Sequence, residues 1–224
     1  MKKEIELKYL LESKSDFNRF KRFLAPFLSG DITLYQQENC YFDTPILHLK
    51  RKGLSLRLRK ENNAYSLSAK QSLKKRGALE NLSVRLEYEA AIETSVAKLI
   101  KSQLLSPLDA FFILPATTAN DRATKMSLHQ QMTKAAKLGL QMIGSFHNLR
   151  AKLPIKLLGH DVELEFDHCV FPKSVEIYEV EVEFSSEQQA NNLRKPLEDL
   201  FAAAGIITHQ SSSKSSRLYK LLYG

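Results

Sequence analysis

A strict alternation of charged and apolar residues recurs along this chain and constrains its fold more than any other feature of the sequence. Residues 4–9 read Glu-Ile-Glu-Leu-Lys-Tyr, with every second side chain charged. A period of two is typical of a β-strand that has one polar and one apolar face. Similar segments, with a further strand near 39–44, give eight predicted strands: 4–9, 39–44, 54–59, 65–70, 85–89, 149–153, 162–167 and 178–184.

Apolar residues at helical spacing lie between these strands. One stripe covers 17–27 and stops at Gly30, a second covers 193–204 and stops at Gly205, and a short helix is predicted from about Ser213. The segment from Thr94 to about 138 predicts a helix, a proline-containing connection and another helix. We therefore expect one domain over residues 1–224, with a largely helical insertion at about 94–145. The basic run at 74–76, followed by Gly77, predicts a hairpin turn.

Eight strands are enough to close a barrel, and the short connections favour an antiparallel order. Most small barrels turn their charges to water and fill the interior with apolar side chains. Here the apolar stripes of the helices need a surface to cover, and only the apolar strand faces are large enough. The sequence therefore predicts an α+β protein: a closed eight-stranded antiparallel β-barrel, or tunnel, with a charged lumen and flanking helices.

The charges also divide by sign among the strands, whereas a solvated face usually mixes signs. Carboxylates stand at 4, 6, 163, 165, 167, 179, 181 and 183, and bases at 57, 59, 70, 150 and 152. Unpaired charges in a poorly hydrated lumen cost several kcal/mol each. The expected occupant thus carries both signs, as a polyphosphate with divalent cations does. For Glu163 and Glu165, salt bridges to lumen bases are an equally good interpretation.

Composition narrows the choice of cation and location. Lys and Arg number 33 against 25 Asp and Glu, a net charge of +8 that favours an anionic partner. Cys40 and Cys169 form no C-x-x-C pair and the histidines show no ligand spacing, so hard oxygen ligands favour magnesium or manganese over zinc. No apolar run approaches the ~20 residues of a membrane span, and we expect a cytoplasmic protein without membrane contact.

Five short motifs, taken together, resemble the CYTH domain of the triphosphate tunnel metalloenzymes, and most closely the bacterial inorganic triphosphatases. They are Glu4-x-Glu6-x-Lys8, Tyr-Phe-Asp-Thr at 41–44, Gly-Leu-Ser-Leu-Arg-Leu-Arg at 53–59, Glu179-x-Glu181-x-Glu183 and Ser213-Lys214-x-x-Arg217. The resemblance implies a metal site made of Glu4, Glu6, Asp167, Glu179, Glu181 and Glu183. It implies that triphosphate is bound by Lys8, Arg57, Arg59, Lys70, Arg85, Arg150, Lys152, Lys214 and Arg217. Glu4, Glu6, Lys8 and Lys214 are the expected catalytic residues.

The resulting hypothesis is a metal-dependent hydrolase that cleaves the terminal phosphoanhydride of inorganic triphosphate with Mg²⁺ or Mn²⁺. The alternatives are a nucleotide-directed CYTH enzyme (an adenylate cyclase, or a nucleoside or thiamine triphosphatase) and a polyphosphate-binding module without turnover. Nucleic-acid binding is not expected, because the bases alternate with apolar residues in tunnel strands. Six aromatic residues, Tyr9, Tyr65, Tyr88, Phe166, Tyr178 and Phe184, have the parity of the apolar face and should not offer the lumen a stacking platform. Tyr41 is not placed by this rule.

Overall fold

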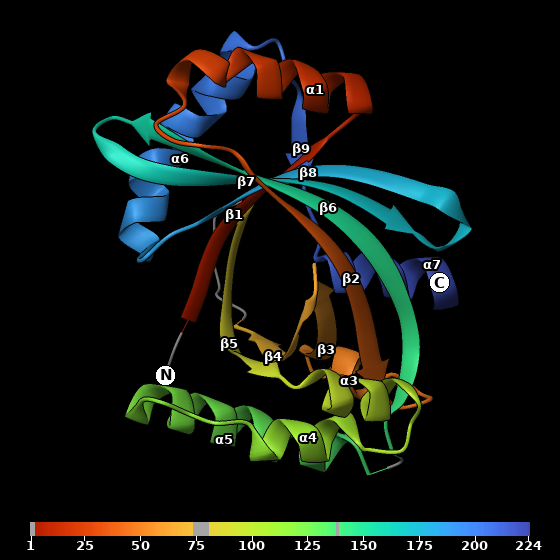
Figure 1. The fold of residues 1–224 in the computed structure, drawn as a ribbon. Helices are drawn as coiled ribbons and strands as arrows, with labels where there is room; N and C mark the ends of the chain where they lie inside the picture. Colours follow the sequence, from red (N-terminus) through yellow and green to blue (C-terminus); the bar gives the residue numbers. More distant parts are fainter. Residues whose placement is uncertain (1–2, 74–80, 138) are drawn as a thin grey trace.

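The computed structural model describes residues 3–73, 81–137 and 139–224, and its strands close into an antiparallel barrel (Figure 1). Pairing of β1 with both β8 and β5 completes the ring. This confirms the predicted eight-stranded tunnel. In order around the barrel the strands are β1 (Lys3–Leu11), β5 (Leu82–Ile92), β4 (Ala64–Ser72), β3 (Leu54–Glu61), β2 (Thr33–Asp43), β6 (Gln141–Leu157), β7 (His160–Phe171) and β8 (Val175–Glu183).

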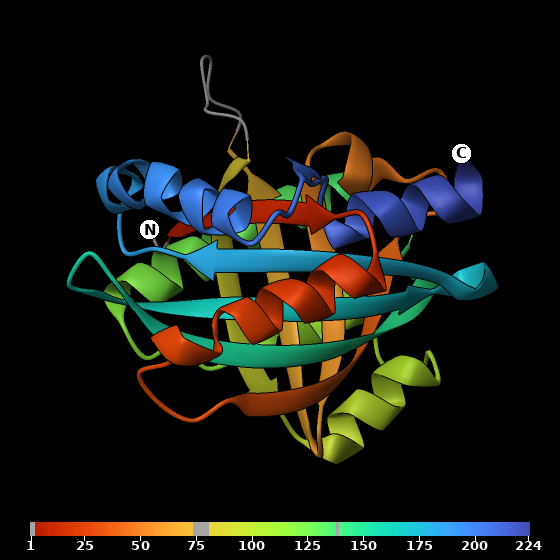
Figure 2. The same ribbon diagram turned by 90° about the horizontal axis from the view of Figure 1, so that it is seen from above.

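Helices cover two outer faces of the barrel, as the apolar stripes predicted. Helices α1 (Lys14–Phe23) and α6 (Glu187–Ala203) lie over β1, β7 and β8, and Figure 2 shows α1 crossing β7 and β8. Phe20 of α1 is fully buried, with ring centroids 4.1 Å from Phe201 and 5.7 Å from Phe166. Helices α3 (Thr94–Lys101), α4 (Pro107–Ile113) and α5 (Ala119–Ala135) cover β3, β4 and β5. The apolar strand faces therefore point outward and the charged faces inward.

The connections differ from the prediction in several places. Three helices lie between β5 and β6 where two were expected, because Ser106 caps a separate helix whose first residue is Pro107. Strand β6 begins at Gln141, so the last residues of the range 94–145 belong to the barrel. A one-turn helix α2 (His48–Arg51) and a short strand β9 (Thr208–Gln210) were not predicted. The predicted turn at 74–77 lies outside the described residues.

The carboxyl-terminal helix α7 (Lys214–Tyr223) packs directly on β6 and brings its first residue to the barrel interior. A Cβ atom at Gly144 would approach Leu222 Cδ1 to 2.5 Å, so a side chain at this position of β6 would have to displace the end of Leu222. Tyr219 donates a hydrogen bond to the buried carboxylate of Asp43 at 3.1 Å. These contacts fix α7 against the end of the barrel and thereby place Lys214. None of the described helices has the length and apolar character needed to span a membrane.

Candidate triphosphate site

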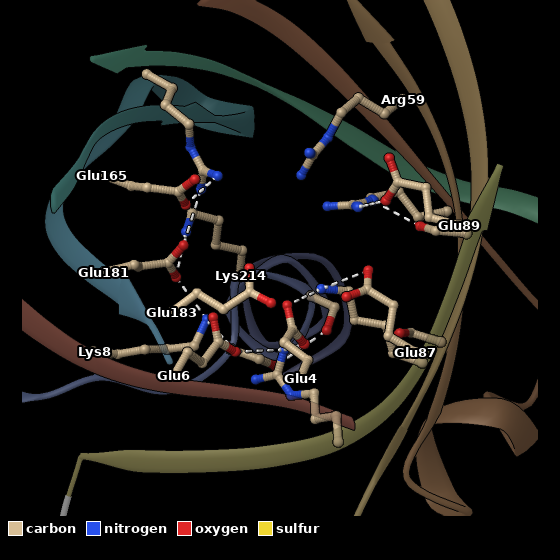
Figure 3. Close-up of a pocket in the computed structure, with 18 of the residues that line it drawn as sticks. Glu4, Glu6, Lys8, Arg59, Glu87, Glu89, Glu165, Glu181, Glu183 and Lys214 are labelled. Carbon is tan, nitrogen blue, oxygen red and sulfur yellow. Dashed lines mark hydrogen bonds and ion pairs between the residues drawn. The ribbon is translucent and has the colours of Figure 1, made fainter. Parts of the chain in front are cut away.

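A cavity of about 280 Å³ lies inside the barrel, and charged side chains from most of the strands point into it (Figure 3). All but three of the predicted site residues line this cavity. The predicted residues that line it are Glu4, Glu6, Lys8, Arg57, Arg59, Lys70, Arg85, Arg150, Lys152, Glu181, Glu183 and Lys214. The structure thus brings together residues from β1, β3, β4, β5, β6, β8 and α7.

Four more carboxylates line the cavity, and they were not among the predicted site residues: Glu61, Glu87, Glu89 and Glu165. Glu87 and Glu89 stand two and four residues after Arg85 on β5 and so share its strand face. This spacing is the sequence pattern that points to them as cavity residues. With these four, the described lining contains eight basic and eight acidic side chains. The cavity is therefore formally neutral, and its charges largely pair with one another.

On the wall formed by β3, β4 and β5, Lys70 and Arg57 contact carboxylates of β1 and β5. Lys70 Nζ lies 2.5 Å from Glu4 Oε1 and 3.0 Å from Glu87 Oε1. Arg57 donates to Glu89 Oε2 at 2.8 Å. Burial opposes the charge of both bases, but the carboxylates outweigh it and raise the pKa of Lys70 and of Arg57. Burial also opposes the charge of Glu89, and Arg57 overcomes it, lowering the pKa of Glu89 to about 2.

On the opposite wall, carboxylates of β7 and β8 hold the bases of β1 and β6. Arg150 contacts Glu165 and donates to Glu181 Oε2 at 2.9 Å. Lys8 donates to Glu181 Oε1 at 2.6 Å. Burial would raise the pKa of Glu181, but Lys214, Lys8 and Arg150 lower it well below its usual range.

The alternative interpretation of Glu163 and Glu165 holds, because both pair with bases. Lys152 Nζ lies 2.7 Å from Glu163 Oε1 and 3.2 Å from Glu165 Oε1.

Three predicted site residues, Asp167, Glu179 and Arg217, lie behind the cavity wall near the start of α7 and do not line the cavity. The carboxylates of Asp167 and Glu179 are fully buried. Both contact Lys214, and Arg217 lies 2.8 Å from Glu179 Oε1. Their predicted contacts with metal and phosphate are therefore not direct in this arrangement.

A divalent cation is implied by the resemblance, and the cavity has oxygen atoms that suit one. Among the described residues, three buried carboxylate oxygens accept no hydrogen bond: Glu4 Oε2, Glu6 Oε1 and Glu179 Oε2. The last two lie 3.0 Å from Lys8 Nζ and 3.2 Å from Lys214 Nζ, respectively. The first two belong to cavity-lining residues of β1. Glu183 stands opposite Glu6 across the β1–β8 pair, and burial, Glu4 and further carboxylates raise its pKa. In the described part of the chain, no group of three or more acidic, histidine or cysteine side chains is already gathered to hold a metal ion. The carboxylate oxygens of Glu4, Glu6 and Glu183 are the donor type that suits a Mg²⁺-like ion, which would take its other ligands from phosphate and water.

Arg59 is the cavity arginine with the weakest compensation. It donates to Asn39 Oδ1 at 3.1 Å, and no carboxylate of the described residues lies within ion-pair distance. Burial lowers the pKa of Arg59, and the like charges of Arg57 and Arg150 lower it further. The guanidinium of Arg59 is therefore available for a bound anion.

Replacing Arg59 by Gln should stabilise the empty protein and weaken substrate turnover, because the change removes repulsion that only an anion relieves. We expect a melting temperature higher by about 2–4 °C, the response of a chain of this size to roughly 1 kcal/mol. Arg57→Gln is the matched control, and it should lower the melting temperature because Glu89 loses its partner. The sequence pattern did not separate these two arginines. Thermal unfolding without ligand checks both variants, and a less stable Arg59→Gln protein would refute the assignment.

The aromatic residues largely follow the predicted parity. Tyr9, Tyr65, Tyr88, Phe166, Tyr178 and Phe184 belong to the outer apolar clusters or pack against them. Tyr41 lines the cavity, but its ring stacks on Phe146 with centroids 6.0 Å apart and is 6 % exposed. Tyr35 also lines the cavity, and Lys152 Nζ lies 5.8 Å from the centre of its ring. The expectation that the lumen has no aromatic side chain is therefore wrong at Tyr35, and Tyr41, which the parity rule left unplaced, also lies at the cavity wall.

Comparison with known proteins places this arrangement in a family. The sequence profile of the CYTH domain matches residues 2–219. The chain belongs to the CYTH domain family. No curated protein matches it by sequence.

Solved CYTH-like structures share the fold. A candidate adenylyl cyclase from Hippeastrum, described as having a dominant triphosphatase activity, is 24% identical with a TM-score of 0.71, over 97% of this chain and 95% of that one. A candidate adenylate cyclase from Bacillus halodurans is also 24% identical, with a TM-score of 0.65 over 98% of this chain and 100% of that one. A protein from Pyrococcus horikoshii has 16% identity and a TM-score of 0.55 over 97% and 99% of the two chains. The tunnel architecture is thus common to all four chains.

Proposed function

We propose that this CYTH protein is a metal-dependent hydrolase that cleaves the terminal phosphoanhydride of inorganic triphosphate. The cavity carries this proposal, because eight bases and eight carboxylates surround a space of about 280 Å³ inside the barrel. An anion alone meets as many negative as positive groups there. A phosphate chain together with a divalent cation satisfies both sets.

The basic and acidic residues of the cavity have different roles. Arg57, Arg59, Lys70, Arg85, Arg150 and Lys152 bind the phosphate oxygens, and the planar guanidinium of each arginine donates to two oxygens at once. Lys8 and Lys214 neutralise charge on the terminal phosphate as its bond to the bridging oxygen lengthens. A cavity carboxylate takes the proton of the attacking water, and phosphate and pyrophosphate leave.

Glu4, Glu6 and Glu183 would hold the cation, and magnesium or manganese suits their oxygen ligands. When bound, such an ion supplies Lewis-acid stabilisation of phosphate charge. The dominant triphosphatase activity described for the Hippeastrum protein supports this class of reaction.

A nucleoside triphosphate is the second candidate substrate, and Tyr35 is the observation that favours it. This tyrosine is only partly buried, so its ring would offer a stacking surface to a base once Lys152 moved away. Lys152 already lies over that ring and is also bound to Glu163. Occupation of the ring by Lys152 makes inorganic triphosphate the better substrate.

We expect kcat/KM for inorganic triphosphate to exceed that for ATP by about tenfold or more, since a missing stacking contribution of ~1.4 kcal/mol gives that factor. Parallel initial-rate measurements with Mg²⁺ and with Mn²⁺ check it, with thiamine triphosphate and GTP as further substrates. Equal specificity constants, or a preference for ATP, would favour the nucleotide-directed enzyme. Binding of triphosphate without release of phosphate would identify a binding module.

A further inference from the structure

The six carboxylates implied as metal ligands do not share one environment. We propose that Asp167 and Glu179 are positioning residues that hold Lys214 and Arg150 for the phosphate chain, and that they do not bind the metal ion. This inference rests on the proposed function, because the bases they hold are those assigned to triphosphate. It concerns how one end of the cavity is built.

Carboxylates face one another in three cross-strand pairs around β8, where like charges destabilise a sheet. Asp167 is opposite Glu179 and Glu165 is opposite Glu181 in the β7–β8 pair. Glu6 is opposite Glu183 in the β1–β8 pair. Each pair needs a cation between its members, and a base of the protein supplies that cation in two of the three pairs.

Lys214 fills the Asp167–Glu179 pair. Its Nζ lies 2.7 Å from Asp167 Oδ2 and 3.2 Å from Glu179 Oε2. Arg150 fills the Glu165–Glu181 pair, since one of its terminal nitrogens contacts Glu165 and the other lies 2.9 Å from Glu181. These two pairs therefore already contain a protein cation.

Asp167 has no oxygen left for a metal ion. Its Oδ1 accepts from Asn148 Nδ2 at 2.8 Å and from Arg150 Nε at 2.7 Å. Its Oδ2 accepts from Arg150 at 2.6 Å and lies 2.7 Å from Lys214. A metal ion at Asp167 would have to displace two bases from a carboxylate that has no exposed surface.

Glu179 is enclosed in the same way. Arg217 lies 2.8 Å from Glu179 Oε1, and Ser211 donates to that oxygen. The remaining oxygen, Oε2, faces Lys214. Glu179 therefore fixes the start of α7, from which Lys214 reaches the cavity.

The third pair lacks a bridging base. Glu6 lies 3.0 Å from Lys8 and 3.3 Å from Arg85, but Glu183 has no ion pair within the described residues. Glu183 is exposed to the cavity, on the same strand face as Glu179 and about 13 Å along the strand from it. In the Glu6–Glu183 pair no protein base bridges the two carboxylates, so a metal ion would meet less competition there than beside Asp167 and Glu179.

The matched pair Glu179→Gln and Glu183→Gln tests the proposal, because both changes remove one charge from β8 with the same chemistry. Electron paramagnetic resonance of added Mn²⁺ measures metal affinity, and initial rates at saturating Mg²⁺ give KM for triphosphate. We expect Glu183→Gln to raise the Mn²⁺ dissociation constant tenfold or more. Glu179→Gln and Asp167→Asn should change it less than threefold but raise KM about tenfold, because Lys214 loses its fixed position. Loss of Mn²⁺ affinity in Glu179→Gln comparable to that in Glu183→Gln would overturn the proposal.

A double-mutant cycle with Lys214→Met keeps the test decisive if Asp167→Asn fails to fold. If Glu179 acts through Lys214, Glu179→Gln should add less than threefold to KM once Lys214 is absent. Full additivity of the two changes would contradict a positioning role. The Mn²⁺ measurement needs no turnover, so an inactive wild-type protein would refute the proposed function without deciding this inference.

Discussion

Replacement of Glu4 by Gln should lower kcat for inorganic triphosphate by about two to three orders of magnitude while the barrel stays folded. The substitution keeps the side-chain volume but removes a charge whose Oε2 atom accepts no hydrogen bond among the described residues. Loss of a metal ligand removes several kcal/mol of charge stabilisation, and each 1.36 kcal/mol is a factor of ten in rate. Lys70 keeps its second ion-pair partner, Glu87, so the variant should remain folded.

Initial rates over a range of Mg²⁺ concentrations measure this effect, and thermal unfolding checks the fold. Glu12→Gln is the matched control, because Glu12 is half exposed and pairs with His209 outside the cavity. It should retain wild-type turnover. Near-wild-type turnover of Glu4→Gln at saturating Mg²⁺ would remove Glu4 from the metal site.

Replacement of Arg57 by Lys should lower kcat/KM for triphosphate by about 10- to 100-fold with little change in fold. Arg57 donates through Nε to Ser68 at 3.1 Å and through a terminal nitrogen to Glu89 at 2.8 Å, which fixes the plane of its guanidinium. Lysine keeps the charge but not the forked geometry, and a hydrogen bond to a charged group contributes about 1.5–3 kcal/mol.

Steady-state kinetics at saturating Mg²⁺ measure the loss, and Arg19→Lys, the same exchange on helix α1 outside the cavity, is the control. Because Arg19 is half exposed and pairs with Asp16, that variant should retain wild-type activity. An Arg57→Lys enzyme that is less stable when empty, yet fully active, would contradict the phosphate-binding role.

Much of the architecture is present in local sequence pattern. Alternation along a strand fixes which residues share a face, and the apolar stripes of α1 and α6 require a cover, so the inward direction of the charges follows. Strand bounds are harder to predict where the residues of a strand carry no alternating charges. The first residues of β2, including Tyr35, show no alternation of charge. The predicted strand therefore begins at residue 39, six residues after the true start of β2 at Thr33. The aromatic side chain at that end of the cavity was missed for the same reason.

The alternation along a strand also does not show how far along the barrel a side chain lies, or whether it reaches the cavity. Glu179 and Glu183 have the same parity and the same side chain, yet one is sealed behind Lys214 and Arg217 and the other is open to the cavity. What separates them is the packing of α7 on β6 at Gly144, a tertiary contact between segments about 70 residues apart. Local spacing cannot distinguish such residues.

The most direct test of the central claim is the stoichiometry of products from inorganic triphosphate with and without a divalent cation. With Mg²⁺ or Mn²⁺, purified protein should release phosphate and pyrophosphate in equal amounts, and an excess of chelator should abolish the release. The Glu4→Gln protein measured in parallel should release neither at a comparable rate. Undiminished cleavage in the presence of chelator, or no cleavage of triphosphate with either cation, would contradict the assignment of this cavity as a metal-dependent triphosphatase site.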